Sequence, residues 1–229
     1  MPTSQNRKKK RKTEHIDEAT EKIYIFCEGE QTEPLYFAGF EKAIKSNPIY
    51  KNTVHVHVEG IGAETLRVIY AAEDYVKNNR IENANIWCVY DKDSFPSQDF
   101  NAVSERARTL NSQQNKVVYH VAWSNQCIEY WFVLHFAFYT ADNDRKYYRS
   151  FLHSKFKELK WNKYEKNNSE LFKIMTENGN PKQAILWAQR RLDECKGLSD
   201  STSAPATKVH LLVQSLVKYL PEDIKIKYI

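Results

Sequence analysis

The chain has 229 residues, a hydrophobic content of 41%, an aromatic content of 13% and a formal net charge of +5. This length allows one large domain with its own core, whereas no apolar stretch is long enough to span a membrane, and the charged N-terminus has no apolar segment of the kind that a secretory signal needs. Four cysteines without a CxxC pair favour reduced, buried thiols in a cytoplasmic protein over a disulfide framework or a zinc site.

Much of the positive charge lies at the N-terminus. Residues 7–12 read RKKKRK, and without these six charges the rest of the chain is close to neutral. We expect residues 1–20 to form a basic, disordered tail. Such a tail can attract nucleic acid nonspecifically, or it can serve solubility alone.

Residues 21–140 alternate apolar strands with helical patterns. The sequence predicts strands at 23–27, 54–58, 85–90 and 116–121, and helices at 32–45, 63–78 and 99–112. This alternation predicts an α/β domain with a parallel, Rossmann-like four-stranded sheet flanked by helices. Right-handed crossovers then place every strand-to-helix turn at the carboxyl edge of the sheet.

Residues 141–229 predict a helical C-terminal region packed on this domain. Helices are expected at 144–157, 169–177, 181–196 and 207–220, with a polar loop at 197–206. Apolar positions between Ile128 and Phe136 repeat at helical spacing and predict a further helix that packs on the sheet.

Acidic residues follow two of the predicted strands. Glu28, Glu30 and Glu33 come after the first strand, and Asp91 and Asp93 come after the third. Since the carboxyl ends of parallel strands share one edge, we expect these carboxylates to converge there. Carboxylate oxygens are the ligands that Mg²⁺ or Mn²⁺ prefers. The alternative is that the acidic residues only cap turns and helices.

Four segments in order resemble the RloB family, also called AbiLii-like, of bacterial phage-defence and abortive-infection proteins. They read CEGEQTEPLYF, VYDKDSFP, WSNQCIEYWFVLHF and ATKVHLLVQSL. Ser124-Asn125-Gln126 differs from the family's Ser-Asn-Pro, and Ala204-Pro205-Ala206-Thr207 differs from its Asn-Pro-Ser-Thr-like turn. The family is similar to Toprim proteins, so the resemblance implies a Toprim-like fold.

The resemblance also implies roles for particular residues. Glu28 matches the Toprim glutamate, a general acid/base or metal ligand, and Asp91 and Asp93 match the magnesium ligands. Glu30 and Glu33 belong to the RloB version of the first motif, with a catalytic or a structural role.

Glu129 lies in an otherwise apolar helix, where an unpaired carboxylate is costly. It is a candidate for the third acidic position that Toprim enzymes often have. The alternative is a core glutamate paired with an arginine or a lysine.

Residues 145–166 hold eight Lys and Arg side chains interleaved with aromatic ones. This composition suits the binding of single-stranded or looped nucleic acid. The alternative is a solvated helix whose aromatic residues, Phe156 and Trp161 above all, pack into the core. The residues that we assign to nucleic-acid binding are Lys92, Arg145, Lys146, Arg149, Lys155, Lys160 and Lys163.

Two further patterns have a plain structural interpretation. His55, His57 and Glu59 alternate along the second strand, as is typical of the solvated face of an edge strand. Gly60-Ile61-Gly62 predicts a tight turn, although this turn lies at the carboxyl edge and can bring backbone amides near a phosphate.

These patterns and the resemblance together predict a cytoplasmic, Mg-dependent nuclease of an anti-phage system. Its substrate is RNA, with tRNA as one example, or DNA. The resemblance implies a partner ATPase encoded nearby. The alternative is a non-catalytic effector or regulatory subunit that binds this ATPase.

Overall fold

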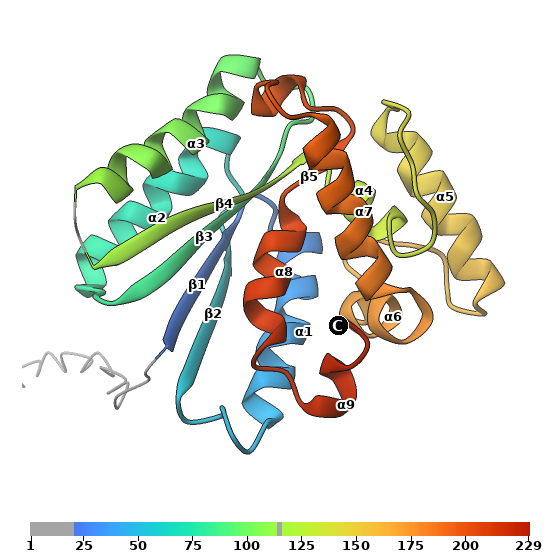
Figure 1. Ribbon diagram of the computed structural model, residues 1–229, viewed down its shortest axis with the longest axis horizontal. Coiled ribbons are helices and arrows are strands. Elements are labelled where there is room, and N and C mark those ends of the chain that lie inside the picture. Colours follow the sequence, from blue (N-terminus) through green and yellow to red (C-terminus); the bar gives the residue numbers. More distant parts are fainter. Residues whose placement is uncertain (1–20, 114–115) are drawn as a thin grey trace, which may run out of the picture.

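A five-stranded sheet forms the centre of the computed structural model, which describes residues 21–113 and 116–229 (Figure 1). The spatial order is β2-β1-β3-β4-β5. The strands are β1 (Glu21–Cys27), β2 (Val54–Gly60), β3 (Ala84–Asp91), β4 (Val117–Asn125) and β5 (Ala206–Thr207). Because β1 to β4 are mutually parallel, the predicted α/β class is confirmed. The tail predicted at residues 1–20 lies outside the described residues.

The prediction of only four strands is corrected by β5. Ala206 and Thr207 pair antiparallel with the end of β4, in a stretch predicted as the junction of a loop and a helix. Thr207 Oγ1 lies 3.0 Å from Ser124 Oγ and donates to the Trp123 carbonyl at 3.1 Å. These contacts satisfy the end of β4, which extends to Asn125 instead of ending at Val121 as predicted.

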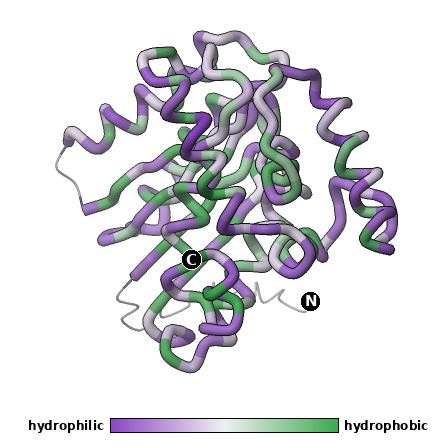
Figure 2. Tube along the Cα trace, turned by 45° about the vertical axis from the view of Figure 1, so that its right-hand side comes forward, coloured by the Kyte–Doolittle hydropathy of each residue, from purple (hydrophilic) through white to green (hydrophobic). Residues whose placement is uncertain are grey.

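Helices cover both faces of the sheet (Figure 1). Tyr24 and Phe26 face the core beneath α2 (Thr65–Asn79) and α3 (Ser97–Ser112), whereas Ile23 and Ile25 face the core of α1 (Thr32–Ser46) and α8 (Val209–Val217). Hydrophobic residues gather along the central strands, while the outlying helices alternate hydrophilic and hydrophobic residues (Figure 2). The alternation along β1 therefore fills two separate apolar layers.

The predicted helices of residues 141–229 are observed close to their expected positions. The remaining elements are α4 (Glu129–Val133), α5 (Arg145–Glu158), α6 (Leu171–Asn178), α7 (Pro181–Glu194), the 3₁₀ turn η1 (Asp200–Thr202) and α9 (Glu222–Lys225). Phe156 is fully buried and Trp161 packs against the same core, which confirms their predicted structural role.

Other sequence-based expectations can be read from the same structure. The four cysteines are free and buried, as expected. His57 stacks on Tyr75 and lies 3.2 Å from the Glu59 carboxylate, on edge strand β2. In residues 21–113 and 116–229, no helix is long and apolar enough to cross a membrane.

Candidate functional site

Glu28 and Asp91 meet at the carboxyl edge because β1 and β3 are neighbours. Cys27 pairs with Val89, so that Glu28 leaves β1 beside the end of β3. Glu28 Oε2 accepts a hydrogen bond from the Asp91 backbone N–H at 2.9 Å, and Oε1 accepts one from Thr65 Oγ1 at 3.3 Å. The Glu28 carboxylate is therefore held in place by β3 and the first residue of α2.

The loop after β3 fixes the position of Asp93. The backbone N–H of Lys92 donates to Ser124 O, and that of Asp93 to Gln126 O, both at 2.9 Å. The Lys92 ammonium donates to the Phe95 carbonyl, so this residue, which we assigned to nucleic-acid binding, braces the loop. Asp93 has a φ of 39°, which is uncommon outside glycine and is maintained only where the surroundings constrain it.

Glu33 joins this group from the first turn of α1. Its side chain is only 8% exposed. Gly29 makes room for it, since a Cβ at this position would collide with the Glu33 carboxylate. The glycine between Glu28 and Glu30 therefore allows Glu33 to lie against the loop after β1.

Cations from the helical region face these acids. Arg145 Nη1 lies 3.0 Å from Asp93 Oδ2, and Arg149 Nε lies 2.9 Å from Oε1 of Glu129. Glu129 is 1% exposed and ion-paired, the geometry expected of a core glutamate. Lys166, which follows α5, lines the same hollow as Asp93.

Negative charge still exceeds positive charge at this edge. Five carboxylates meet three cations, which leaves two negative charges in excess when all are ionised. The carboxylates are Glu28, Glu33, Asp91, Asp93 and Glu129, and the cations are Arg145, Arg149 and Lys166. We refer to these five acids as the carboxylate cluster.

The pKa values of the cluster reflect burial and mutual repulsion. Burial raises the pKa of Glu28 to about 7. Burial, followed by repulsion from Glu33 and Glu129, raises the pKa of Asp91 well above its usual value. Burial also raises the pKa of Asp93, against the opposing effect of Arg145. An added cation would relieve all three groups.

Two oxygens in the cluster have no hydrogen-bond partner. Asp91 Oδ2 accepts from the Ile128 N–H at 3.1 Å, and Asp93 Oδ2 from Arg145, but Oδ1 of each aspartate is buried and unpaired. Unpaired buried acceptors are rare because they lose their hydration without replacement. Carboxylate oxygens of this kind are ligands for hard cations. Among the described residues, however, no group of three or more His, Cys, Asp and Glu side chains is arranged so that it could hold a metal ion.

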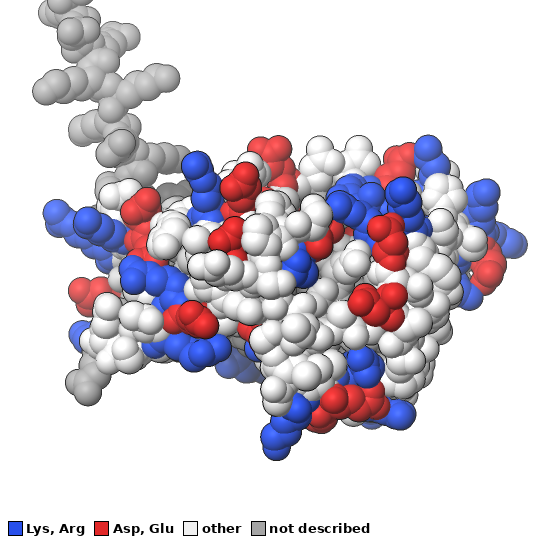
Figure 3. All heavy atoms as spheres, turned by 90° about the horizontal axis from the view of Figure 1, so that it is seen from above, with Lys and Arg blue, Asp and Glu red and all other residues white. Residues whose placement is uncertain are grey.

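Two hollows border the cluster and share Glu28 and Asp93. The first, which we call the α2 hollow, has a volume of about 550 Å³ and is also lined by Gly62, Ala63, Glu64, Arg67 and Phe95. The second, the Lys166 hollow, has a volume of about 270 Å³ and also contacts Asp91 and residues 29–33. On the face seen from above, Lys and Arg are interspersed with Asp and Glu and do not form one basic surface (Figure 3).

Other predicted residues lie around the cluster. Glu30 is exposed, and its side chain approaches Gly62, whose φ of 63° belongs to the predicted tight turn. Lys146 and Lys160 are exposed. Lys155 and Lys163 form ion pairs with Glu158 and Glu165.

Sequence reasoning did not assign Thr65, Arg67, Phe95 or Lys166 to the site. The one signal for Thr65 and Arg67 is their position directly after the glycine turn at the carboxyl edge. Lys166 was counted in the basic stretch but not distinguished within it, because its approach to Asp93 depends on packing between distant segments.

Comparison with known proteins gives a family match. The model of the RloB-like protein family matches residues 23–216, whereas no curated protein and no solved structure matches the chain. The matched range contains the whole sheet apart from the first two residues of β1, and all five acids of the cluster. This family suggests a role related to phage defence. Because the match covers most of its length, the chain belongs to the RloB-like family.

Proposed function

We propose that the chain is a Mg²⁺- or Mn²⁺-dependent nuclease of a phage-defence system, with a Toprim-type active site in the carboxylate cluster. The observation that carries this proposal is the pair of buried, unpaired oxygens on Asp91 and Asp93 beside Glu28. Its first candidate substrate is RNA, for example tRNA, and its second is DNA. The protein acts in the cytoplasm with a partner ATPase.

Asp91 and Asp93 would hold the metal ion, and Glu28 would serve as a further ligand or as the base that activates water. A donor set made of carboxylates suits Mg²⁺ or Mn²⁺ and differs from the histidine and cysteine sets of zinc sites. When bound, such an ion polarises the phosphate and lowers the pKa of a coordinated water.

Glu28 is the residue best placed to move a proton. Burial raises its pKa to about 7, near the pH at which a general base is most effective. The hydrogen bonds from Thr65 and the Asp91 N–H orient its carboxylate. Arg145 and Lys166 supply positive charge close to where a phosphate would gain negative charge.

The test is cleavage by the purified protein of tRNA, single-stranded RNA and plasmid DNA, each with Mg²⁺, Mn²⁺ or EDTA. We expect metal-dependent cleavage by the wild-type chain and its loss in Asp91→Ala. Asp74→Asn is a matched control, because Asp74 is an exposed acid on α2, away from both hollows.

A parallel measurement of Mn²⁺ binding by calorimetry separates the proposed enzyme from a non-catalytic subunit. The enzyme requires binding that Asp91→Ala removes. If no substrate is cleaved and Asp91→Ala binds Mn²⁺ like the wild type, the nuclease proposal is wrong. The chain would then be an effector that acts through its ATPase partner.

A further inference from the structure

The α2 hollow contains side chains that a metal centre does not require. It is larger than the Lys166 hollow, and its volume of about 550 Å³ is within the range of sites for small organic ligands. Glu28 and Asp93 belong both to the cluster and to the lining of this hollow, and Arg67 and Phe95 line it as well. A ligand in this hollow would therefore lie directly beside the proposed reacting centre.

Phe95 is an aromatic residue without a role in the core. It belongs to neither of the two apolar layers, and within the described residues its ring has no aromatic partner. The loop that carries it is nevertheless braced, since the Phe95 N–H donates to Lys92 O at 3.1 Å and the Lys92 ammonium donates to the Phe95 carbonyl. The ring is thus held half-exposed at the hollow by a fixed backbone.

Arg67 is a cation available for a ligand. It lies exposed in the first turn of α2, and in the part of the chain that the structure describes its guanidinium has no ion pair. Arg145 and Arg149, by contrast, already contact acids of the cluster. Among the arginines near the site, Arg67 is therefore the one that can pair with a phosphate without first breaking a contact.

We propose that the α2 hollow binds one unpaired nucleotide of a single-stranded or looped nucleic acid, next to the phosphate that lies at the carboxylate cluster. Phe95 stacks on the base and Arg67 pairs with the adjoining phosphate. Lys166 contacts the strand on the other side, so its path runs from one hollow to the other across Glu28 and Asp93. This inference rests on the proposed nuclease function for its location, and it excludes a continuous duplex, whose stacked bases are not accessible.

The test measures binding without cleavage. Fluorescein-labelled single strands of RNA and DNA, roughly 12 nucleotides long, and the matching duplex are titrated with the full chain in EDTA and in Ca²⁺, with fluorescence anisotropy as the readout. We expect the single strands to bind more tightly than the duplex. Phe95→Leu should weaken the binding of single strands by about five-fold or more. Phe95→Tyr keeps an aromatic ring and should bind them like the wild type.

Arg67→Gln should weaken binding by about five-fold and reduce the slope of log K against log salt by about 0.7, the change expected for one lost phosphate contact on a single strand. Arg108→Gln is the matched control, because Arg108 is an exposed arginine on α3 outside the hollow, and it should bind like the wild type. Circular dichroism verifies that each variant is folded.

The inference is overturned if the chain does not bind single strands, if it prefers the duplex, or if Arg67→Gln and Phe95→Leu bind like the wild type. Failure of the proposed function gives a different pattern. In that case binding depends on Arg67 and Phe95, but no substrate is cut.

Discussion

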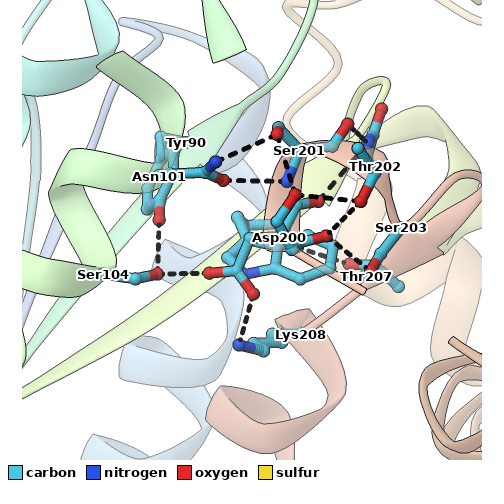
Figure 4. A network of polar contacts seen from close by, with 12 residues as sticks. Tyr90, Asn101, Ser104, Asp200, Ser201, Thr202, Ser203, Thr207 and Lys208 are labelled. Atoms are coloured by element: carbon cyan, nitrogen blue, oxygen red, sulfur yellow. Dashed lines mark hydrogen bonds and ion pairs between the residues drawn. The ribbon is translucent and has the colours of Figure 1, made fainter. Parts of the chain in front are cut away.

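Asp200 and Asp91 differ in whether their carboxylate oxygens have partners. Asp200, in η1, accepts a hydrogen bond from Ser104 Oγ at 2.5 Å and an ion pair from Lys208 Nζ at 3.0 Å, one on each oxygen (Figure 4). Asp91, at the end of β3, has one oxygen bonded to a backbone N–H and one buried without a partner, among four other carboxylates. Asp200 is neutralised by its neighbours, and Asp91 is not.

The surroundings of Asp200 form a continuous network. Ser104 Oγ also lies 3.2 Å from the Tyr90 hydroxyl, while Asn101 and Ser201 are joined by two hydrogen bonds of 2.9 and 3.1 Å (Figure 4). A satisfied, partly buried network of this kind stabilises one arrangement of the chain. A group of buried acids without partners is a reason to expect a ligand. The presence or absence of hydrogen-bond partners therefore distinguishes the Asp200 network from the carboxylate cluster better than residue type does.

The largest expected effect of a single substitution is at Asp200. Asp200→Ala removes both of its charge-assisted contacts and leaves Lys208 unpaired, which should lower the free energy of unfolding by about 3 kcal/mol. Urea denaturation measures this loss. The affinity for Mn²⁺ should not change, and a fall in affinity without a loss of stability would contradict the assignment of Asp200 to structure.

Asp91→Asn should have the opposite sign. The amide keeps an acceptor for the Ile128 N–H but removes a buried acid from a repulsive cluster, so that in EDTA the free energy of unfolding should rise, most strongly at a pH high enough to ionise Asp91. The same variant should lose any stabilisation by Mg²⁺. Denaturation in EDTA and in Mg²⁺ measures both effects, and destabilisation in EDTA would show that the Asp91 charge is compensated within the chain.

The difference between the two clusters also explains what could be predicted from the sequence. Glu28, Asp91 and Asp93 were found because they lie at the end of a strand or within two residues of it, and parallel strands bring their carboxyl ends together. The apolar helix around Glu129 predicted pairing with an arginine or a lysine as one of two alternatives but did not identify Arg149 as the partner, and the network of Asp200 has no local signal. Ser104 and Asp200 are 96 residues apart, so their contact depends on packing and not on periodicity.

The same limit applies to elements of the fold. The strands β1 to β4 have an apolar, β-branched pattern, but β5 has two residues and therefore no period. Its pairing is determined by the contacts of Thr207 with β4. Arg67 and Phe95 were missed for a related reason. Arg67 belongs to no motif, Phe95 lies in the VYDKDSFP segment without any signal of its own, and only the assembled edge places both at one hollow.

The pH dependence of stability provides a test of Glu28 that requires no ligand. Its pKa rises from 4.5 to about 7 in the folded chain, so between these values the folded state binds more protons than the unfolded state. The contribution of Glu28 to the free energy of unfolding in EDTA should therefore fall as the pH rises from 4.5 to 7, by at most about 1.4 kcal/mol per pH unit. Burial lowers the pKa of His135 and of His210 to about 4, which acts in the opposite direction, so the effect of Glu28 is measured as the difference in free energy of unfolding between the wild type and Glu28→Gln. A difference that does not fall through this range would refute the shift.

The smallest expected effect is at Arg145, whose ion pair with Asp93 is partly exposed. A metal ion bound to Asp93 competes with this arginine for the carboxylate, so Arg145→Gln should raise the affinity for Mn²⁺. The expected increase is about two- to five-fold, because a partly exposed ion pair contributes under about 1 kcal/mol. Calorimetric titration of the folded variant measures the change. Lys146→Gln is the control, because Lys146 is the next residue on α5 and is exposed.

A fall in affinity for Arg145→Gln would show instead that the arginine orients Asp93 for the metal, as Lys208 fixes Asp200. The two outcomes differ in what Arg145 does when the ion binds. A competing arginine leaves Asp93 and is free to contact a phosphate, whereas an orienting one stays in place. A fall in Mn²⁺ affinity would mean that the ion pair of Arg145 and Asp93 is fixed, like that of Lys208 and Asp200. A rise would mean that the ion pair of Arg145 opens when the metal ion binds, so that the carboxylate cluster differs from the Asp200 network in its ion pairing as well.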